Sequence, residues 1–173
     1  MKATLYVASS LNGLMTNGPT NSSWVSGGDE VLFAETCKEV GCILVGRQTF
    51  DQYQGVVYPV PGAKNIVLTA QDRTSEREDV FFEKNLQKAF ERIDALGFKR
   101  FVVVGGAKVI EQCLNQRLID KFYISLHPYL FKEGLSIVGG YRGDIDLEFV
   151  GIKHQHHEFT LLEYNVKNYK DKE

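Results

Sequence analysis

The fold of this chain is decided by the stretch Lys99-Arg100-Phe101-Val102-Val103-Val104-Gly105-Gly106-Ala107-Lys108-Val109-Ile110-Glu111-Gln112-Cys113-Leu114. The segment 101–104 is apolar throughout and rich in β-branched residues, which is typical of a strand buried on both faces. Beyond Gly105 and Gly106, apolar residues recur at helical spacing. Because glycine lacks a Cβ, the backbone there can approach a ligand closely, and the start of the following helix favours an anion. The stretch therefore predicts a phosphate-binding junction between a strand and a helix.

The glycine junction does not match either of the common nucleotide-binding motifs. The pattern G-x-G-x-x-G is absent, because the position of its third glycine holds an apolar helix residue, and G-x-x-x-x-G-K-[ST] occurs nowhere in the chain. Many α/β proteins also turn from strand to helix through glycine without binding a ligand. Nucleotide binding at this junction therefore needs support from other parts of the chain.

Length and composition indicate one ordinary globular domain. The chain has 173 residues, with 43% hydrophobic and 24% charged residues, and we expect a domain at 1–167 followed by a solvated tail at 168–173. The net charge of −2 argues against a nucleic acid or a membrane surface as partner. Three cysteines without C-x-x-C spacing predict reduced core thiols, and neither a secretory signal nor a membrane span is visible. These features predict a cytoplasmic protein.

Two further strand ends resemble the first junction. The apolar segment 42–45 precedes Gly46, Arg47 and Thr49, and the segment 64–69 ends at Leu68 and Thr69. Strands and helices alternate up to residue 114, which predicts a parallel sheet with ligands outside the carboxyl ends of its strands. The junctions after residues 45, 68 and 104 then open on the same edge of the sheet. Their convergence strengthens the prediction of a nucleotide site.

The last third of the chain predicts strands without helices. The segments 122–126, 145–152 and 159–166 are rich in β-branched and aromatic residues, and the last two are predicted to form a hairpin. With the earlier segments and two further apolar segments, 3–8 and 79–83, they make eight strands, so the sheet should end in an antiparallel hairpin. An uncovered sheet of this kind is commonly covered by a second copy, which predicts a homodimer.

A histidine cluster lies at the predicted hairpin turn. His154 and His156 would share one face of a strand, and His157 follows them. No second group of cysteines, histidines or carboxylates at ligand spacing is visible in the sequence. We therefore expect no metal site.

The central segments resemble a known superfamily. The run 104–112, followed by Leu118-Ile119-Asp120-Lys121-Phe122-Tyr123-Ile124-Ser125, resembles the dihydrofolate reductase-like superfamily. His127-Pro128-Tyr129-Leu130-Phe131-Lys132-Glu133-Gly134 is similar, more narrowly, to the reductase domain of bacterial riboflavin biosynthesis. The resemblance implies a three-layer α/β/α fold with a mostly parallel eight-stranded sheet and an antiparallel C-terminal hairpin.

The resemblance also implies an activity. Such a protein would be an NADPH-dependent oxidoreductase, like the 5-amino-6-(5-phosphoribosylamino)uracil reductase of riboflavin biosynthesis. A reductase of dihydrofolate, another pterin or another small molecule remains an alternative, as does a nucleotide-binding protein without turnover. Members similar to this chain dimerise through their last strands, which agrees with the predicted homodimer.

Site residues follow from the same resemblance. A carboxylate near the start of the first helix contacts the pterin in dihydrofolate reductases, so Asp29 and Glu30 are the catalytic candidates. Asn12 stands where the family usually has aspartate, and with Trp24 and Phe33 it forms the expected substrate side. The expected cofactor residues are Ser10, Gly13, Gly46, Arg47, Thr49, Leu68, Thr69, Gly105, Gly106, Ala107 and Val109.

Overall fold

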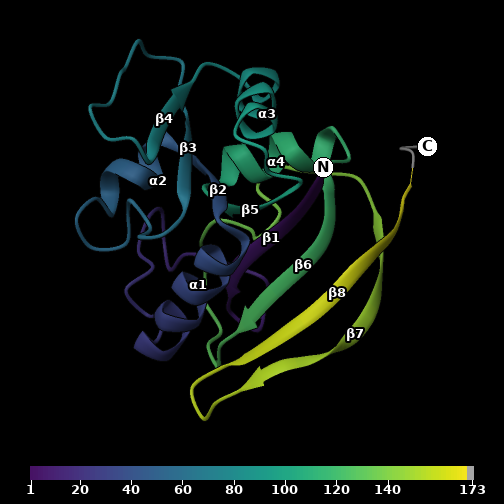
Figure 1. The fold of residues 1–173 in the computed structure, drawn as a ribbon. Helices are drawn as coiled ribbons and strands as arrows, with labels where there is room; N and C mark the ends of the chain where they lie inside the picture. The colour runs from purple at the N-terminus through teal and green to yellow at the C-terminus, as the bar shows by residue number, and fades with distance from the viewer. Residues whose placement is uncertain (171–173) are drawn as a thin grey trace.

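The computed structural model describes residues 1–170 and shows one eight-stranded sheet with helices on both faces (Figure 1). The strands are β1 (Lys2–Ser9), β2 (Cys42–Gly46), β3 (Lys64–Leu68), β4 (Val80–Glu83), β5 (Arg100–Gly105), β6 (Ile119–Leu126), β7 (Ile145–Gln155) and β8 (Thr160–Tyr169). The helices are α1 (Gly27–Val40), α2 (Arg47–Gln52), α3 (Leu86–Ala95) and α4 (Ala107–Asn115). The sheet order is β4-β3-β2-β5-β1-β6-β8-β7, parallel from β4 to β6 and antiparallel beyond. The predicted sheet is confirmed.

The two faces of the sheet carry separate apolar clusters. Neighbouring residues of β5 point to opposite faces, so Val103 packs with α3 and α4, and Val102 packs with the side chains of α1 and α2. Both valines are fully buried. The continuous apolar run of β5 is therefore explained by burial on both faces, as the sequence predicts.

Helix α1 has well-defined ends that fix the position of its first turn. The side chain of the N-cap residue Ser26 accepts a hydrogen bond from the backbone N–H of Asp29, and Gly41 ends the helix in the left-handed conformation. Asp29 and Glu30 lie in the first turn, where carboxylates interact favourably with the helix dipole.

The C-terminal hairpin extends beyond the helices, and β7 forms one edge of the sheet (Figure 1). Its exposed apolar residues are Phe149, Val150 and Ile152, with exposed fractions of 56%, 49% and 56%. Strand β8 continues to Tyr169, whose hydroxyl donates to the carbonyl of Ile119, so the tail expected from residue 168 does not begin there. The rest of that tail, 171–173, lies outside the described residues.

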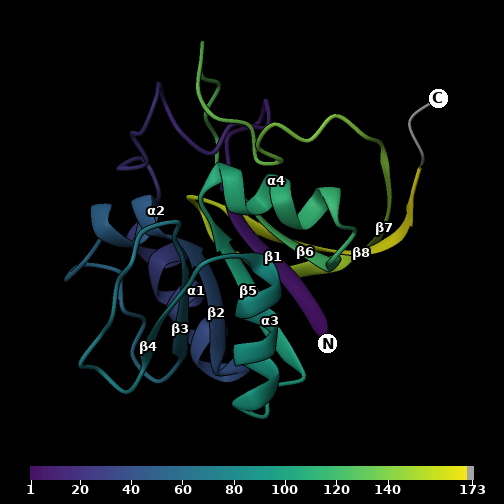
Figure 2. The same cartoon turned by 90° about the horizontal axis from the view of Figure 1, so that it is seen from above.

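Two long loops lie together at the carboxyl end of β1 and β6 (Figure 2). Isolated bridges join Leu14 to Ser136 and Gly18 to Gly134, so the loop after β1 is held by the loop after β6. This pairing gives the long polar segment a fixed place next to the start of α1. Among residues 1–170, no helix combines the length and apolarity that crossing a bilayer requires.

Candidate active site

The glycines of two strand-to-helix junctions pack directly against each other. A Cβ on Gly106 would lie 2.6 Å from Thr49 Oγ1, and a Cβ on Gly46 would lie 3.0 Å from Val109 Cγ2 and 3.4 Å from the Gly106 nitrogen. Real Cβ atoms almost never come as close as the first of these distances, so a side chain at 106 would force the Thr49 side chain to move. The structure thus brings together Gly46, Thr49, Gly106 and Val109 from the predicted cofactor set.

The backbone beside this contact is open. Gly105 has a φ of +114°, a conformation that favours glycine, and a Cβ placed there would meet nothing within 4 Å. The peptide bond between Gly105 and Gly106 is cis. Helix α4 begins at Ala107 without a side-chain cap on its first turn, so its N-terminal N–H groups and dipole favour an anion. The site accordingly offers open space and donors at the end of β5.

Two arginines share one carboxylate at the neighbouring strand ends. Asp51 Oδ2 accepts from Arg47 at 3.0 Å, and Arg73 bonds both carboxylate oxygens of Asp51 at 2.7 and 3.0 Å. Burial alone would raise the pKa of Asp51, but the two guanidinium groups outweigh it and hold that pKa below its usual range. One carboxylate against two arginines leaves a net positive charge, and both guanidinium groups remain about 30% exposed. This charge is suited to a phosphate.

Two of the other predicted cofactor residues, Thr69 and Ser10, have side chains that hydrogen-bond within the protein. The Thr69 hydroxyl accepts from the backbone of Gln71, with Leu68 half-buried before it. The Ser10 hydroxyl donates to Asn12 and accepts from the backbone of Leu14, and Gly13 completes this turn with a φ of +77°. The hydroxyls of Thr69 and Ser10 thus stabilise the turns that follow β3 and β1.

Asp29 is buried among polar side chains from three elements. It is 2% exposed, and its Oδ1 accepts from the Tyr6 hydroxyl at 2.7 Å. Burial raises its pKa most strongly, opposed by the hydroxyls of Tyr6 and Ser125 and by His127. Burial and the adjacent carboxyl also raise the pKa of Tyr6. A buried carboxyl with a raised pKa is a typical candidate for moving a proton.

Glu30, in contrast, points to solvent. Of the two carboxylates at the start of α1, only Asp29 therefore lies among buried polar groups. The one-residue ambiguity arises because both residues occupy the first turn of the same helix, and a sequence does not show which of them faces the sheet.

His127 completes this buried group from the opposite loop. Its Nε2 accepts from the backbone N–H of Ser26 at 3.3 Å and lies 4.0 Å from Asp29 Oδ2, while Nδ1 lies 3.1 Å from the carbonyl of Ser125. This pattern assigns the ring proton to Nδ1. The Ser125 hydroxyl also lies beside Asp29 and lowers the pKa of that carboxyl.

The predicted substrate residues differ in what they contact. Trp24 packs edge-on against His127, with 5.1 Å between ring centroids, and its buried Nε1 has no partner in the described chain. Phe33 packs on the Tyr6 ring at 5.3 Å. Asn12 uses its side chain to bond both backbone groups of Phe131, which ties the two long loops together. Trp24 and Phe33 thus contact His127 and Tyr6, the neighbours of Asp29. Asn12 instead connects the loop after β1 to the loop after β6.

Sequence reasoning missed three members of the buried group. Tyr6, Ser125 and His127 were assigned only to strands or to a loop, because their spacing from Asp29 follows no local motif. A polar residue inside an apolar strand is the one signal in the sequence that could have identified Tyr6 and Ser125. Their contacts with Asp29 depend on how β1, β6 and α1 lie beside one another in the fold.

Two solved structures share the fold of this chain. A protein assigned to riboflavin biosynthesis from Shewanella sp. PV-4 superposes with a TM-score of 0.74 and 21% identity, covering 97% of this chain and 100% of its own. The second structure is a diaminohydroxyphosphoribosylaminopyrimidine deaminase/5-amino-6-(5-phosphoribosylamino)uracil reductase from Thermotoga maritima. It superposes with a TM-score of 0.74 and 18% sequence identity, covering 95% of this chain and 56% of its own. The fold defines the class as a dihydrofolate reductase-like α/β domain.

The sequence family is narrower than the fold. The chain belongs to the RibD C-terminal domain family, which matches residues 2–161. It is also 31% identical to the dihydrofolate reductase type 1 of Escherichia coli over 126 residues, 72% of this chain and 74% of that protein. The resemblance inferred from the central segments is confirmed, and these relatives are of reductase type.

Proposed function

We propose that this protein is an NADPH-dependent reductase of a small molecule. The observation that carries the proposal is the arginine pair Arg47 and Arg73, placed beside the open glycine junction at the same edge of the sheet. A dinucleotide carrying a 2′-phosphate needs a pyrophosphate site and a separate cationic site. Both lie at the ends of adjacent strands here, where parallel sheets commonly bind ligands.

The residues present fit such a cofactor. The space over Gly105 and the first turn of α4 would accept the pyrophosphate, because a Cβ placed on Gly105 would meet nothing within 4 Å. Arg47 and Arg73 would hold the 2′-phosphate. When bound, NADPH supplies the hydride. The protein orients the two reactants and excludes water from the reacting atoms.

The substrate would lie against the buried group around Asp29. Its carboxyl could hold or donate a proton at the position where the hydride is added, since burial raises its pKa. Trp24 Nε1, which has no hydrogen-bond partner within residues 1–170, would bond a polar substrate atom. We infer that the substrate is a small molecule with a reducible C=N or C=O bond, and the family points first to the pyrimidine ribosylamine phosphate of riboflavin biosynthesis.

Dihydrofolate is the second candidate substrate. The observation in its favour is the buried carboxyl of Asp29 at the start of α1, together with the 31% identity to a dihydrofolate reductase. A buried carboxylate is suited to pair with the N–H groups of a pterin ring. A nucleotide-binding protein without turnover would use the cofactor site alone.

An assay of NADPH oxidation distinguishes the two candidate substrates from each other and from binding without turnover. Purified protein is mixed with NADPH and either the ribosylamine substrate or dihydrofolate, and loss of NADPH absorbance is followed. Turnover of the first supports the riboflavin-pathway reaction, and turnover of the second supports the alternative. Calorimetric binding of NADPH without turnover of either substrate would indicate a binding protein. Absence of NADPH binding at millimolar concentration would contradict the reductase proposal.

We further propose a homodimer in the cytoplasm. The exposed apolar residues Phe149, Val150 and Ile152 lie on the edge strand β7, and exposed edges of this kind are commonly covered by a second copy. The three cysteines are all buried and unpaired, which suits a reducing compartment.

A further inference from the structure

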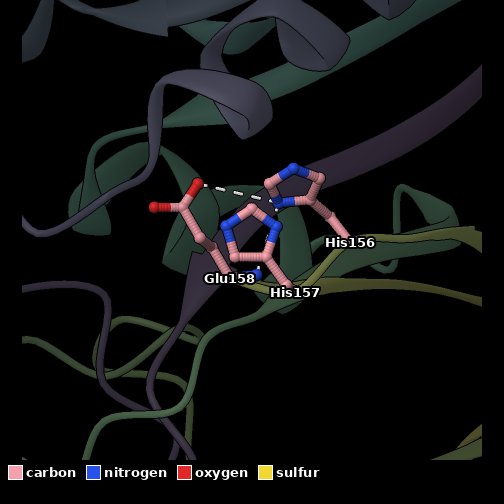
Figure 3. Close-up of side chains that lie close together, drawn as sticks. All are labelled: His156, His157 and Glu158. Atoms are coloured by element: carbon pink, nitrogen blue, oxygen red, sulfur yellow. Dashed lines mark hydrogen bonds and ion pairs between the residues drawn. The ribbon is translucent and has the colours of Figure 1, made fainter.

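The turn between β7 and β8 gathers three side chains that can bind a metal ion (Figure 3). His156, His157 and Glu158 each offer one ligand atom, and these atoms all lie within 4.8 Å of one another. From the sequence we expect no metal site, because no second group of ligands is visible beside His154, His156 and His157. The structure adds Glu158, directly after His157, to the side chains at this turn.

The distances are close to those of a coordinated ion. His156 Nδ1 lies 3.6 Å from Glu158 Oε2. With bonds of about 2.0–2.1 Å, two ligand atoms of a tetrahedral zinc site lie about 3.3 Å apart. His157 and Glu158 are exposed and their side chains can rotate, so small torsional changes suffice to bring in the third ligand. The backbone N–H of Glu158 donates to His156 Nδ1 at 3.3 Å. If that nitrogen bound the metal, this N–H would donate its hydrogen bond to water instead.

The turn is anchored by one buried aromatic residue, so its ligands are not on a free loop. Phe159 is 3% exposed and lies between histidine rings, with His156 at 5.4 Å and His127 at 5.5 Å between centroids. A Cβ on Gly28 would lie 3.3 Å from Phe159 and 3.8 Å from His156 Cε1, so the turn also packs on the first turn of α1. Anchoring of the turn limits the entropy that a metal would cost on binding.

We propose that His156, His157 and Glu158 form a binding site for a divalent transition-metal ion of the Zn²⁺ class, with one coordination position left open. Two imidazoles and one carboxylate make a ligand set that Zn²⁺ and Co²⁺ accept, and three protein ligands leave room for water or an anion. The site goes beyond the reductase function and does not depend on it. Its ion would fix the hairpin tip beside the start of α1.

Titration with Zn²⁺ alone, on the full chain, tests the site. Calorimetry compares the unchanged protein with His157→Ala and Glu158→Gln, both at exposed positions where folding should not suffer. His154→Ala is the matched control, because His154 belongs to the same hairpin and stacks on Phe159 at 5.7 Å but lies outside the ligand set. Loss even of a residue that only supports a metal ligand typically weakens binding about 10–100-fold, so each ligand variant should lose at least about tenfold. The control should keep its affinity.

Co²⁺ absorption gives an independent measurement. A site of nitrogen and oxygen ligands shows weak visible bands, which His157→Ala should abolish and His154→Ala should keep. Intense thiolate-to-metal absorption would instead assign the ion to a cysteine and overturn the proposal. The proposal also fails if Zn²⁺ binds no more tightly than millimolar, or if His154→Ala loses as much affinity as His157→Ala.

Discussion

Replacing Gly106 with alanine should separate the packing of the glycine junction from its use by a cofactor. The φ of Gly106 is −79°, which alanine adopts without strain, so the effect comes from the new Cβ, 2.6 Å from Thr49 Oγ1. Inserting a methyl group into a packed site typically costs about 1–3 kcal/mol of unfolding free energy. For a domain of this size, about 2 kcal/mol lowers the melting temperature by roughly 4–8 °C.

The double variant Gly106→Ala with Thr49→Ala removes the cause of that loss. The next atom that the new Cβ would meet is Thr49 Cβ at 3.9 Å, an ordinary contact, so thermal unfolding should return to that of Thr49→Ala alone. NADPH affinity, measured by calorimetry, should still be at least about tenfold weaker than in Thr49→Ala, equivalent to about 1.4 kcal/mol, because the methyl group adds bulk at the N-cap of α4, beside the space over Gly105 where we propose that the pyrophosphate binds. Equal affinities in these two variants would refute the assignment of the pyrophosphate site, and unrestored stability would refute the assigned clash.

Three further outcomes are expected. Arg47→Ala and Arg73→Ala should each weaken NADPH about tenfold and NADH hardly at all, because losing either guanidinium leaves Asp51 neutralised and no net positive charge; equal losses for both cofactors in calorimetry would contradict this. The difference in unfolding free energy between Asp29→Asn and the unchanged protein should change in favour of Asp29→Asn as pH rises from about 4 to about 7. The pKa of Asp29 is higher in the folded protein than in the unfolded one, so the protonated carboxyl stabilises the unchanged protein fully below the unfolded pKa, and this stabilisation is lost at higher pH. Chemical denaturation at several pH values measures the gap, which should not shrink. Ile152→Lys should convert a sedimenting dimer into the 19.6 kDa chain, whereas Val56→Lys, at a position 83% exposed, should not; a monomer already present at micromolar concentration would remove the dimer proposal.

Most of the fold could be predicted from local sequence patterns. The apolar run before Gly105 and the one before Gly46 each predicted a buried strand that ends at an edge, and both strands lie side by side in the sheet. Strand burial on two faces leaves a continuous apolar run, which is a strong signal. The end of β8 was less predictable, since Asn168 and Tyr169 continue the strand although lysines surround them.

The site was predictable only where its residues follow a strand directly. Gly46, Arg47 and Gly106 could be found in this way, because the direction of a parallel strand determines which edge its end reaches. Tyr6 and His127 could not, since their contact with Asp29 depends on the register of β1 with β6 and on the path of a loop. No spacing in the sequence encodes such a contact.

The position of β1 in the sheet also has a consequence for synthesis on the ribosome. Within this sheet β1 is synthesised before every other strand, yet its neighbours β5 and β6 begin only at Arg100 and Ile119. At about 5–20 residues per second, β1 waits for roughly 5–20 seconds before its first partner has been made. During that interval β2, β3 and β4 can already pair with one another. The nascent chain must therefore keep an apolar strand without its sheet partners for seconds.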